Sequence, residues 1–139
     1  MAPYTSSLAE ALAPDILARF DRYVRIDTQS KRDRTQSPST PGQLELAALL
    51  ARELADIGLT DAAVDGNGYT TATLPAAGGG DPATVVGLIA HVDTSPDAPG
   101  AGVVPIVHRA YDGSVIALPR NATKLDPETE PHLASRTGH

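Results

Sequence analysis

A continuous apolar run, Val85 to Ala90, constrains the fold of this chain more than any other feature of its sequence. No polar residue interrupts the run, and unbroken apolarity is typical of a strand that is covered on both faces. Such strands lie at the centre of sheets in α/β proteins. We therefore predict a central strand over 84–92 and an α/β fold.

Two amphipathic helices are predicted before this strand. From Pro14 to Arg25 apolar residues recur every three or four positions, which indicates a helix with Pro14 in its first turn. The segment Thr40-Pro41-Gly42-Gln43 has the pattern of a capping box, and the helix after it should end at Gly58. Between the helices, residues 27–39 are predicted to form a solvated polar loop.

Shorter strands are predicted on either side of the central run. Their ranges are Ala62–Val64, Tyr69–Leu74, Val103–Val107 and Ser114–Leu118. The first two flank Asp65-Gly66-Asn67-Gly68, a strong turn signal, so they should form a hairpin. From Pro119 to His139 the sequence is polar and lacks periodicity. We expect too few helices to cover both faces of a sheet, and a poorly structured C-terminal tail.

Composition excludes several classes of function. The formal charge of the 139 residues is −6 and no basic stripe is present, so we expect no nucleic-acid partner. The absence of cysteine excludes thiolate zinc sites and a cysteine nucleophile. We find neither a signal-peptide pattern nor an apolar run near the roughly 20 residues of a membrane span. We therefore expect no membrane association and a cytoplasmic location.

His91 and Asp93 stand at the end of the predicted central strand. Residues two apart in a strand point to the same side, and open α/β sheets place ligands at the carboxyl ends of their strands. Imidazole is a common metal ligand, and a nearby carboxylate can orient it. The spacing alone leaves a metal ligand and a strand-end ion pair as alternatives. A Ser-His-Asp triad with Ser95 and Asp97 is disfavoured, because these residues crowd around a proline turn.

The segment GLIAHVDTSPDAPG, Gly87 to Gly100, resembles the M20 family of dinuclear zinc exopeptidases, and within it the tripeptide aminopeptidase (peptidase T) branch. The likeness extends in order from Pro14 to Leu118, through RFDRYVRIDTQS, SPSTPGQ, ELADIGL and TATLPA. This resemblance implies the first segment of a three-layer α/β/α zinc-exopeptidase catalytic domain, which is incomplete here.

The resemblance also implies a chemistry. It assigns His91 as the first zinc ligand and Asp93 as the active-site aspartate that orients this ligand. In the family, two zinc ions share a bridging carboxylate and a water, a glutamate acts as general base, and the activated water attacks the first peptide bond of a short peptide. The substrates implied are short peptides, chiefly tripeptides, and a separate domain forms a homodimer.

The remaining ligands of such a site have no counterpart in this sequence. Nothing after Asp97 supplies an Asp-Asp or Glu-Glu pair, whereas a catalytic zinc needs about three protein ligands. His108, His132 and His139 are expected to be solvated. We therefore expect the N-terminal portion of a tripeptide aminopeptidase, inactive alone. The alternative is a non-catalytic module, derived from the same family, that binds or assembles with a partner.

The expected organisation has three parts. Residues 1–13 should be a flexible N-terminus, residues 14–118 the first part of the catalytic domain, and residues 119–139 the tail where the chain is cut short.

Overall fold

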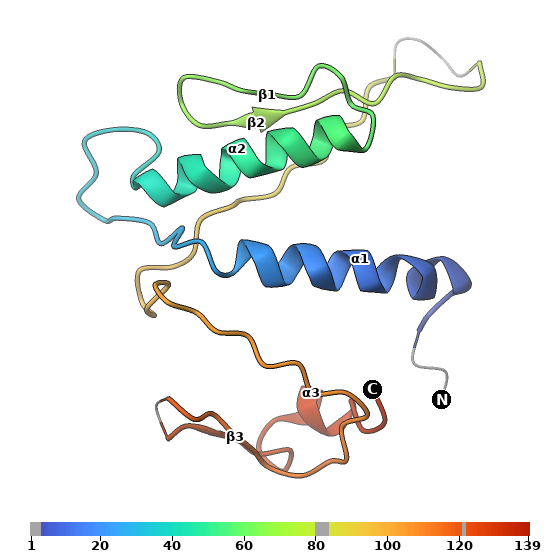
Figure 1. Ribbon diagram of the computed structural model, residues 1–139, viewed down its shortest axis with the longest axis vertical. Coiled ribbons are helices and arrows are strands. Elements are labelled where there is room, and N and C mark those ends of the chain that lie inside the picture. Colours follow the sequence, from blue (N-terminus) through green and yellow to red (C-terminus); the bar gives the residue numbers. More distant parts are fainter. Residues whose placement is uncertain (1–3, 80–83, 121) are drawn as a thin grey trace. The chain divides into compact units, whose positions relative to one another are not determined.

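A computed structural model of the chain describes residues 4–79, 84–120 and 122–139. Its elements, labelled in Figure 1, are α1 (Ser7–Tyr23), α2 (Pro41–Asp56), β1 (Ala63–Val64), β2 (Thr70–Thr71), β3 (Ile116–Ala117), β4 (Lys124–Leu125) and α3 (Pro131–Ala134). They divide into two compact units, Ala18–Val104 and Met1–Leu17 with Pro105–His139. Helices and small antiparallel sheets agree with the predicted α/β class, whereas the three-layer catalytic domain stays a prediction. Among the described helices, none has the length and apolarity that crossing a membrane requires.

Helix α1 begins at Ser7, so the predicted start at Pro14 is wrong. The Ser6 hydroxyl accepts a hydrogen bond from the Ala9 amide at 3.1 Å, which is how a serine stabilises the first turn of a helix. Pro14 lies inside the helix, where it cannot donate to the carbonyl of Glu10. Of the segment predicted to be flexible, residues 1–3 lie outside the described residues.

Helix α2 follows the predicted bounds closely. Thr40 is the N-cap, Pro41 occupies the first turn, and Gly58 follows the end of the helix with φ +102°. The Leu59 amide donates to the Leu54 carbonyl at 3.0 Å, and the Gly58 amide donates to Ala55 at 2.9 Å. This pair of bonds is the Schellman motif, which satisfies carbonyls that the helix leaves free.

The capping box at the start of α2 forms differently from the prediction. The Thr40 hydroxyl makes no cap bond and donates instead to the Gln29 carbonyl at 2.9 Å. Gln43 does reach back, but its Oε1 accepts from the amide of Ser39 rather than that of Thr40, at 3.0 Å. The side chains of this turn therefore bind the preceding loop.

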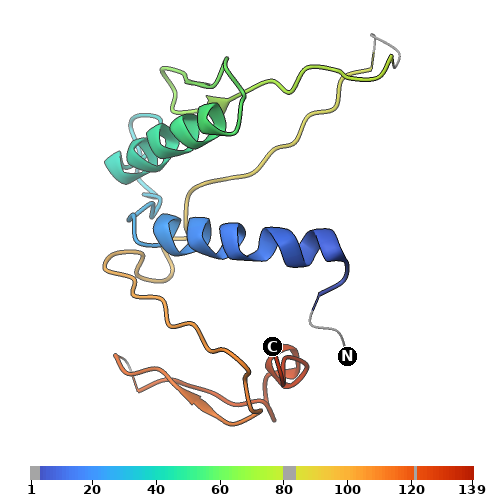
Figure 2. The ribbon, with the colours of Figure 1, turned by 45° about the vertical axis from the view of Figure 1, so that its right-hand side comes forward.

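The predicted hairpin is confirmed. Strands β1 and β2 pair antiparallel, with Val64 opposite Thr70. Asp65 Oδ1 closes the turn by accepting from the amides of Asn67 and Tyr69, both at 2.9 Å. The hairpin lies against α2, as Figure 2 shows, and the Thr70 hydroxyl donates to the Ala47 carbonyl at 3.1 Å.

Within the unit Ala18–Val104, one carboxylate joins α1 to α2. Glu53 accepts hydrogen bonds from Arg19, Arg22 and Tyr23, and its side chain is only 12% exposed. Burial raises the pKa of Glu53, but the hydrogen bonds from Tyr23 and Arg22 and the two guanidinium charges outweigh it, so the net pKa is lowered. Burial, followed by the bond to Glu53, raises the pKa of Tyr23.

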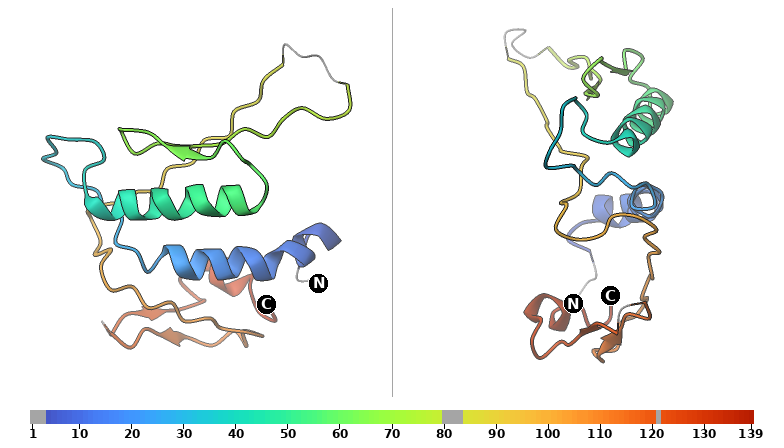
Figure 3. Two further views of the ribbon diagram at one scale, coloured as in Figure 1. Left: turned by 45° about the horizontal axis from the view of Figure 1, so that its top comes forward. Right: turned by 90° about the vertical axis from the view of Figure 1, so that its left-hand side faces the viewer.

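The central strand predicted over 84–92 is wrong for this chain. The segment is extended but belongs to no strand, and Figure 3 shows it as a yellow trace. Its large apolar side chains are between 79% and 100% exposed: Val85, Val86, Leu88 and Ile89. A central strand needs a partner backbone on each side, and no named strand within the described ranges pairs with this segment.

The later strands differ from the prediction in part. Val103–Val107 contains no strand, whereas β3 lies within the predicted Ser114–Leu118. Strand β3 pairs antiparallel with β4, and α3 follows, so residues 119–139 contain some regular structure. In the same unit Tyr111 is buried, and its carbonyl accepts from the Gly138 amide at 2.7 Å. The three proposed segment boundaries stay predictions.

Candidate functional site

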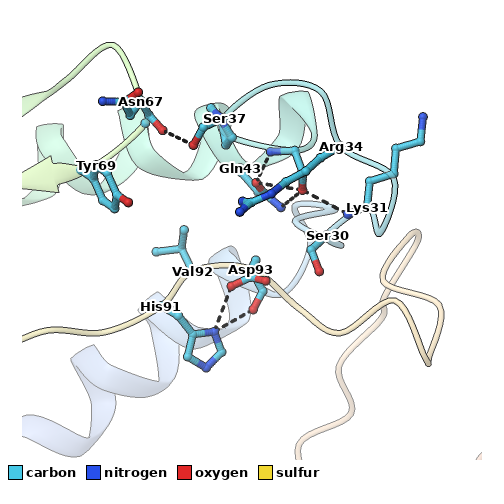
Figure 4. Close-up of a pocket in the computed structure, with 13 residues that line it drawn as sticks. Ser30, Lys31, Arg34, Ser37, Gln43, Asn67, Tyr69, His91, Val92 and Asp93 are labelled. Atoms are coloured by element: carbon cyan, nitrogen blue, oxygen red, sulfur yellow. Dashed lines mark hydrogen bonds and ion pairs between the residues drawn. The ribbon is translucent and has the colours of Figure 1, made fainter.

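The structure brings His91 and Asp93 together at the surface of the unit Ala18–Val104. His91 Nδ1 lies 3.3 Å from Asp93 Oδ1 and 2.9 Å from the Asp93 main-chain oxygen (Figure 4). The His91 side chain is 86% exposed and that of Asp93 45% exposed. With its proton on Nδ1, the ring donates to these oxygens and leaves the Nε2 lone pair directed elsewhere. A ring held in this way can offer Nε2 to a metal ion.

Ser95 and Asp97 do not extend this pair into a triad. The Ser95 hydroxyl donates to Asp97 Oδ2 at 2.9 Å, and the Asp97 amide donates to the Ser95 hydroxyl at 3.2 Å. His91 contacts Asp93 instead. A serine nucleophile with its histidine base is therefore not assembled here, and Ser95 and Asp97 close a turn.

A parallel bridge between Gln29 and Thr94 holds the backbone that follows Asp93. The Ser30 amide donates to the Thr94 carbonyl at 2.9 Å, and the Thr94 amide donates to the Thr28 carbonyl at 3.2 Å. The sequence predicted only a solvated loop here. Thr28 is buried at 3% exposure. The Asp-Thr-Gln-Ser string within the resemblance was the sequence signal that this part of the loop has a defined structure.

Side chains reinforce the bridge. Gln29 Nε2 donates to the carbonyls of Ala98 at 2.7 Å and Ser95 at 3.3 Å, and Arg32 forms an exposed ion pair with Asp97. The turn after the His91–Asp93 pair is thereby bound to the loop that follows α1.

Gln43, in the first turn of α2, fixes the opposite side of this loop. It is buried, and its Nε2 donates to the Thr28 carbonyl at 3.2 Å and to the Ser39 hydroxyl at 3.1 Å. A buried amide with both of its polar atoms bonded holds a loop firmly. From its sequence context, Gln43 was predicted only to cap the helix.

A cavity of about 400 Å³ opens beside His91 and Asp93. Its lining comes from residues 30–39, from Gln43, from residues 67–69 of the β1–β2 turn and from residues 91–93. The volume falls within the range of about 300–1,000 Å³ that small-molecule sites occupy. The sequence gives no sign of this cavity, because it depends on contacts between segments that lie far apart in the chain.

Comparison with known proteins gives a clear result. No model of a known protein family matches the chain. Peptidase T from Bacillus cereus strain Q1 is 46% identical to it over 129 residues, which is 92% of this chain. Peptidase T from Bacillus anthracis is 45% identical over 126 residues, or 90% of the chain. The chain is a homologue of peptidase T. The resemblance expected from the sequence is therefore confirmed.

The chain spans about a third of the length of the peptidase T relatives that it matches. The aligned region is 31% of the Bacillus cereus protein and 30% of the Bacillus anthracis protein. The similarity covers His91, Asp93 and the cavity, because nearly all of this chain is aligned. The name of the relatives identifies them as peptidases.

The fit of this peptidase T homologue to a zinc site is partial. His91 Nε2 and the carboxylate behind Nδ1 suit one coordination position of a zinc ion. Within the residues that the structure describes, no group of three or more His, Cys, Asp or Glu side chains is close enough to hold a metal. The described part of this chain therefore does not by itself assemble the about three ligands that a catalytic zinc requires.

The other histidines are not among the residues that line the cavity. His108, His132 and His139 are exposed, as predicted, and all three belong to the other unit, Met1–Leu17 with Pro105–His139. Among the described histidines, His91 is thus the one that lines the cavity.

Proposed function

We propose that this chain is the N-terminal part of a zinc aminopeptidase of the M20 type, which releases the N-terminal residue of tripeptides. The observation that carries the proposal is the 46% identity to peptidase T over 92% of the chain. The side-chain geometry supports it, because Asp93 lies against Nδ1 of His91. We assign His91 as a zinc ligand and Asp93 as the residue that orients it.

The chemistry divides between this chain and the rest of the protein. Zinc, when bound, supplies Lewis-acid polarisation and a lowered water pKa. His91 contributes Nε2 as one ligand, and Asp93 holds the tautomer that leaves Nε2 free to bind. In this proposal the remaining ligands and the general base belong to the part of the polypeptide outside this chain. That polypeptide also provides the dimerisation domain, and the enzyme acts in the cytoplasm.

The test uses the complete polypeptide that carries this sequence. We expect it to bind zinc, to hydrolyse tripeptides and to lose activity to a chelator. His91→Ala should lower the zinc content and reduce hydrolysis at least 100-fold, and Asp93→Asn should cost about 10- to 100-fold. His108→Ala is the matched control, since this histidine is exposed and outside the cavity. Chelator-insensitive hydrolysis that survives His91→Ala would overturn the proposal.

A second candidate function is a non-catalytic module that binds or assembles with a partner. The observation in its favour is that the described residues contain no group of three or more His, Cys, Asp or Glu side chains that could hold a metal ion. It predicts that the 139 residues unfold cooperatively by themselves and take up no zinc. Zinc uptake with tripeptide hydrolysis by the complete polypeptide would exclude it.

A further inference from the structure

One peptide group connects the His91 ring to a buried hydrogen bond of the loop after α1. His91 Nδ1 lies 2.9 Å from the main-chain oxygen of Asp93, closer than the 3.3 Å to Asp93 Oδ1 (Figure 4). That oxygen and the Thr94 amide belong to the same peptide unit. Because a peptide unit is planar, a bond that fixes the direction of its N–H also fixes the direction of its C=O. The main-chain contact to the ring therefore depends on what holds the Thr94 amide.

The carbonyl of Thr28 holds this amide. The Thr94 amide donates to it at 3.2 Å, and Thr28 is 3% exposed. Away from water, a carbonyl that loses a hydrogen bond cannot replace it from the solvent, so the bond favours one position of the peptide unit. The position of the Thr28 carbonyl thus sets the position of the Asp93 oxygen in front of the His91 ring.

Gln43, in the first turn of α2, makes the second hydrogen bond to the same carbonyl. Its Nε2 donates to the Thr28 oxygen at 3.2 Å, and a carbonyl oxygen has two lone pairs, so it can accept from Gln43 and Thr94 together. Gln43 is 6% exposed and reaches Thr28 from a helix, which is a rigid support. The hydrogen bonds therefore connect α2 to the peptide unit that faces the ring.

The amide of Gln43 has no N–H group left for a ligand, although the residue lines the cavity. One N–H of Nε2 binds Thr28, the other donates to the Ser39 hydroxyl at 3.1 Å, and Oε1 accepts from the Ser39 amide at 3.0 Å. Only an amide side chain donates and accepts in this way, since a carboxylate at this position could not donate to Thr28. Gln43 therefore acts within the protein and does not contact a substrate.

Resting on the proposed function, we propose that Gln43 is a positioning residue of the zinc site, which acts on His91 through the Thr28 carbonyl and the peptide unit between Asp93 and Thr94. It favours the arrangement in which Nδ1 of His91 carries the proton and donates to the Asp93 oxygens, and Nε2 is left for a ligand. Gln43 contacts neither zinc nor substrate in this proposal.

A hydrogen bond on another side of α2 provides the matched control. The Thr70 hydroxyl donates to the Ala47 carbonyl at 3.1 Å and is partly buried, like the contact of Gln43. Thr70 does not line the cavity, and its bond does not lead to the peptide unit beside His91. Thr70→Val should therefore lower the free energy of unfolding without changing zinc affinity or the His91 ring.

The experiment uses the complete polypeptide and measures zinc affinity by competition with a chelator. Gln43→Met is close in length to glutamine and has no N–H group. It should weaken zinc binding about 3- to 10-fold, which is less than the about 10- to 100-fold typical of residues that bond a metal ligand directly. Gln43→Asn keeps an amide that is one carbon too short to reach Thr28 and Ser39 together, so its loss of affinity should be smaller but measurable.

A second measurement reports on the ring without zinc or activity. Nitrogen NMR of the metal-free polypeptide, with the His91 signals identified from their absence in His91→Ala, gives the tautomer of the ring at alkaline pH, where histidine is neutral. The unmodified protein should have the proton on Nδ1, and Gln43→Met should lower the fraction of this tautomer.

The outcomes separate this inference from the proposed function. If Gln43→Met leaves both zinc affinity and tautomer unchanged while tripeptides are still cleaved, the inference is overturned and the aminopeptidase assignment stands. An equal loss of zinc affinity in Thr70→Val would show an effect of stability alone and would also overturn it. If Gln43→Met does not fold, unchanged affinity and tautomer in Gln43→Asn have the same meaning. If the unmodified polypeptide neither binds zinc nor cleaves tripeptides, the proposed function is overturned, and the zinc site to which Gln43 is assigned is overturned with it.

Discussion

At the scale of single residues, Glu53 of α2 accepts the side-chain hydrogen bonds that join α2 to α1. Three donors from α1 converge on its carboxylate, which is 12% exposed. Hydrogen bonds to a charged group contribute about 1.5–3 kcal/mol each when removed from water. The ionised form of Glu53 therefore stabilises the packing of α1 on α2.

The lowered pKa of Glu53 predicts that stability depends on pH in the acid range. A carboxyl group whose pKa is lower in the folded than in the unfolded state stabilises the protein above the unfolded pKa of about 4.3. This stabilisation is lost as the pH falls through the folded value. We expect denaturant titrations between pH 7 and pH 3 to show this loss, and Glu53→Gln to lower the free energy of unfolding at pH 7 by about 1–3 kcal/mol.

Glu45→Gln is the control for Glu53→Gln, since Glu45 is exposed on the same helix. It should keep the stability and the acid-range slope of the unmodified protein. An equal effect of the two substitutions would contradict the role of the Glu53 contacts.

Residue by residue, the sequence predicted the pair His91 and Asp93 but not the groups around it. A two-residue spacing is local, so it is visible without the fold, and the structure places the two side chains together. Arg34 and Gln43 belong to segments that meet the pair only after folding. Their positions beside the pair depend on contacts between segments that lie far apart in the sequence.

At the scale of elements, the start of α2 depends on a close approach to the loop after α1. A Cβ atom at Gly42 would overlap the carbonyl oxygen of Asp27 and lie 2.8 Å from its carbonyl carbon. No side chain fits there without moving the backbone. The same turn carries Gln43, whose amide holds the Thr28 carbonyl.

Gly42→Ala should therefore displace the first turn of α2 and lower the free energy of unfolding by at least about 1–3 kcal/mol. Gly66→Ala is the control, because a Cβ there meets nothing within 4 Å and the backbone is not in the left-handed region. It should leave stability unchanged or raise it slightly. Denaturant unfolding of the two variants measures the difference, and equal stabilities would show that the close approach is not rigid.

The elements that the sequence predicted best are those with local causes. Helix α2 and the β1–β2 hairpin are fixed by caps, apolar periodicity and turn residues, and both were predicted. Residues 84–92 form no strand, although their apolar pattern predicts a buried one. A buried strand forms only where partner strands pair with it and cover it. The early start of α1 was missed because Pro14 is tolerated inside the helix.

At the scale of the whole molecule, the described residues bury few apolar side chains. The buried apolar residues are Leu46, Ala47 and Tyr111, while the run from Val85 to Ile89 is largely exposed. An exposed extended segment that is apolar and uncharged promotes association with other chains.

We therefore expect the 139-residue chain to self-associate, as light scattering can measure. Ile89→Lys should reduce this association several-fold, because a charge interrupts the apolar run. In the complete polypeptide the same substitution should instead lower the free energy of unfolding by more than about 2 kcal/mol, since the proposed central strand would be buried there. Ala77→Lys, in an exposed loop, adds the same charge and should have neither effect.

The bridge between Gln29 and Thr94 has a consequence for how this protein tolerates change. It joins residues 65 positions apart in the sequence, so a displacement of the Asp-Thr-Gln-Ser segment would displace the backbone that carries His91. A substitution in that segment can therefore displace the His91 ring without contacting it. Under the proposed function, selection on the zinc site therefore also acts on residues 27–30, to which the proposal assigns no chemical role.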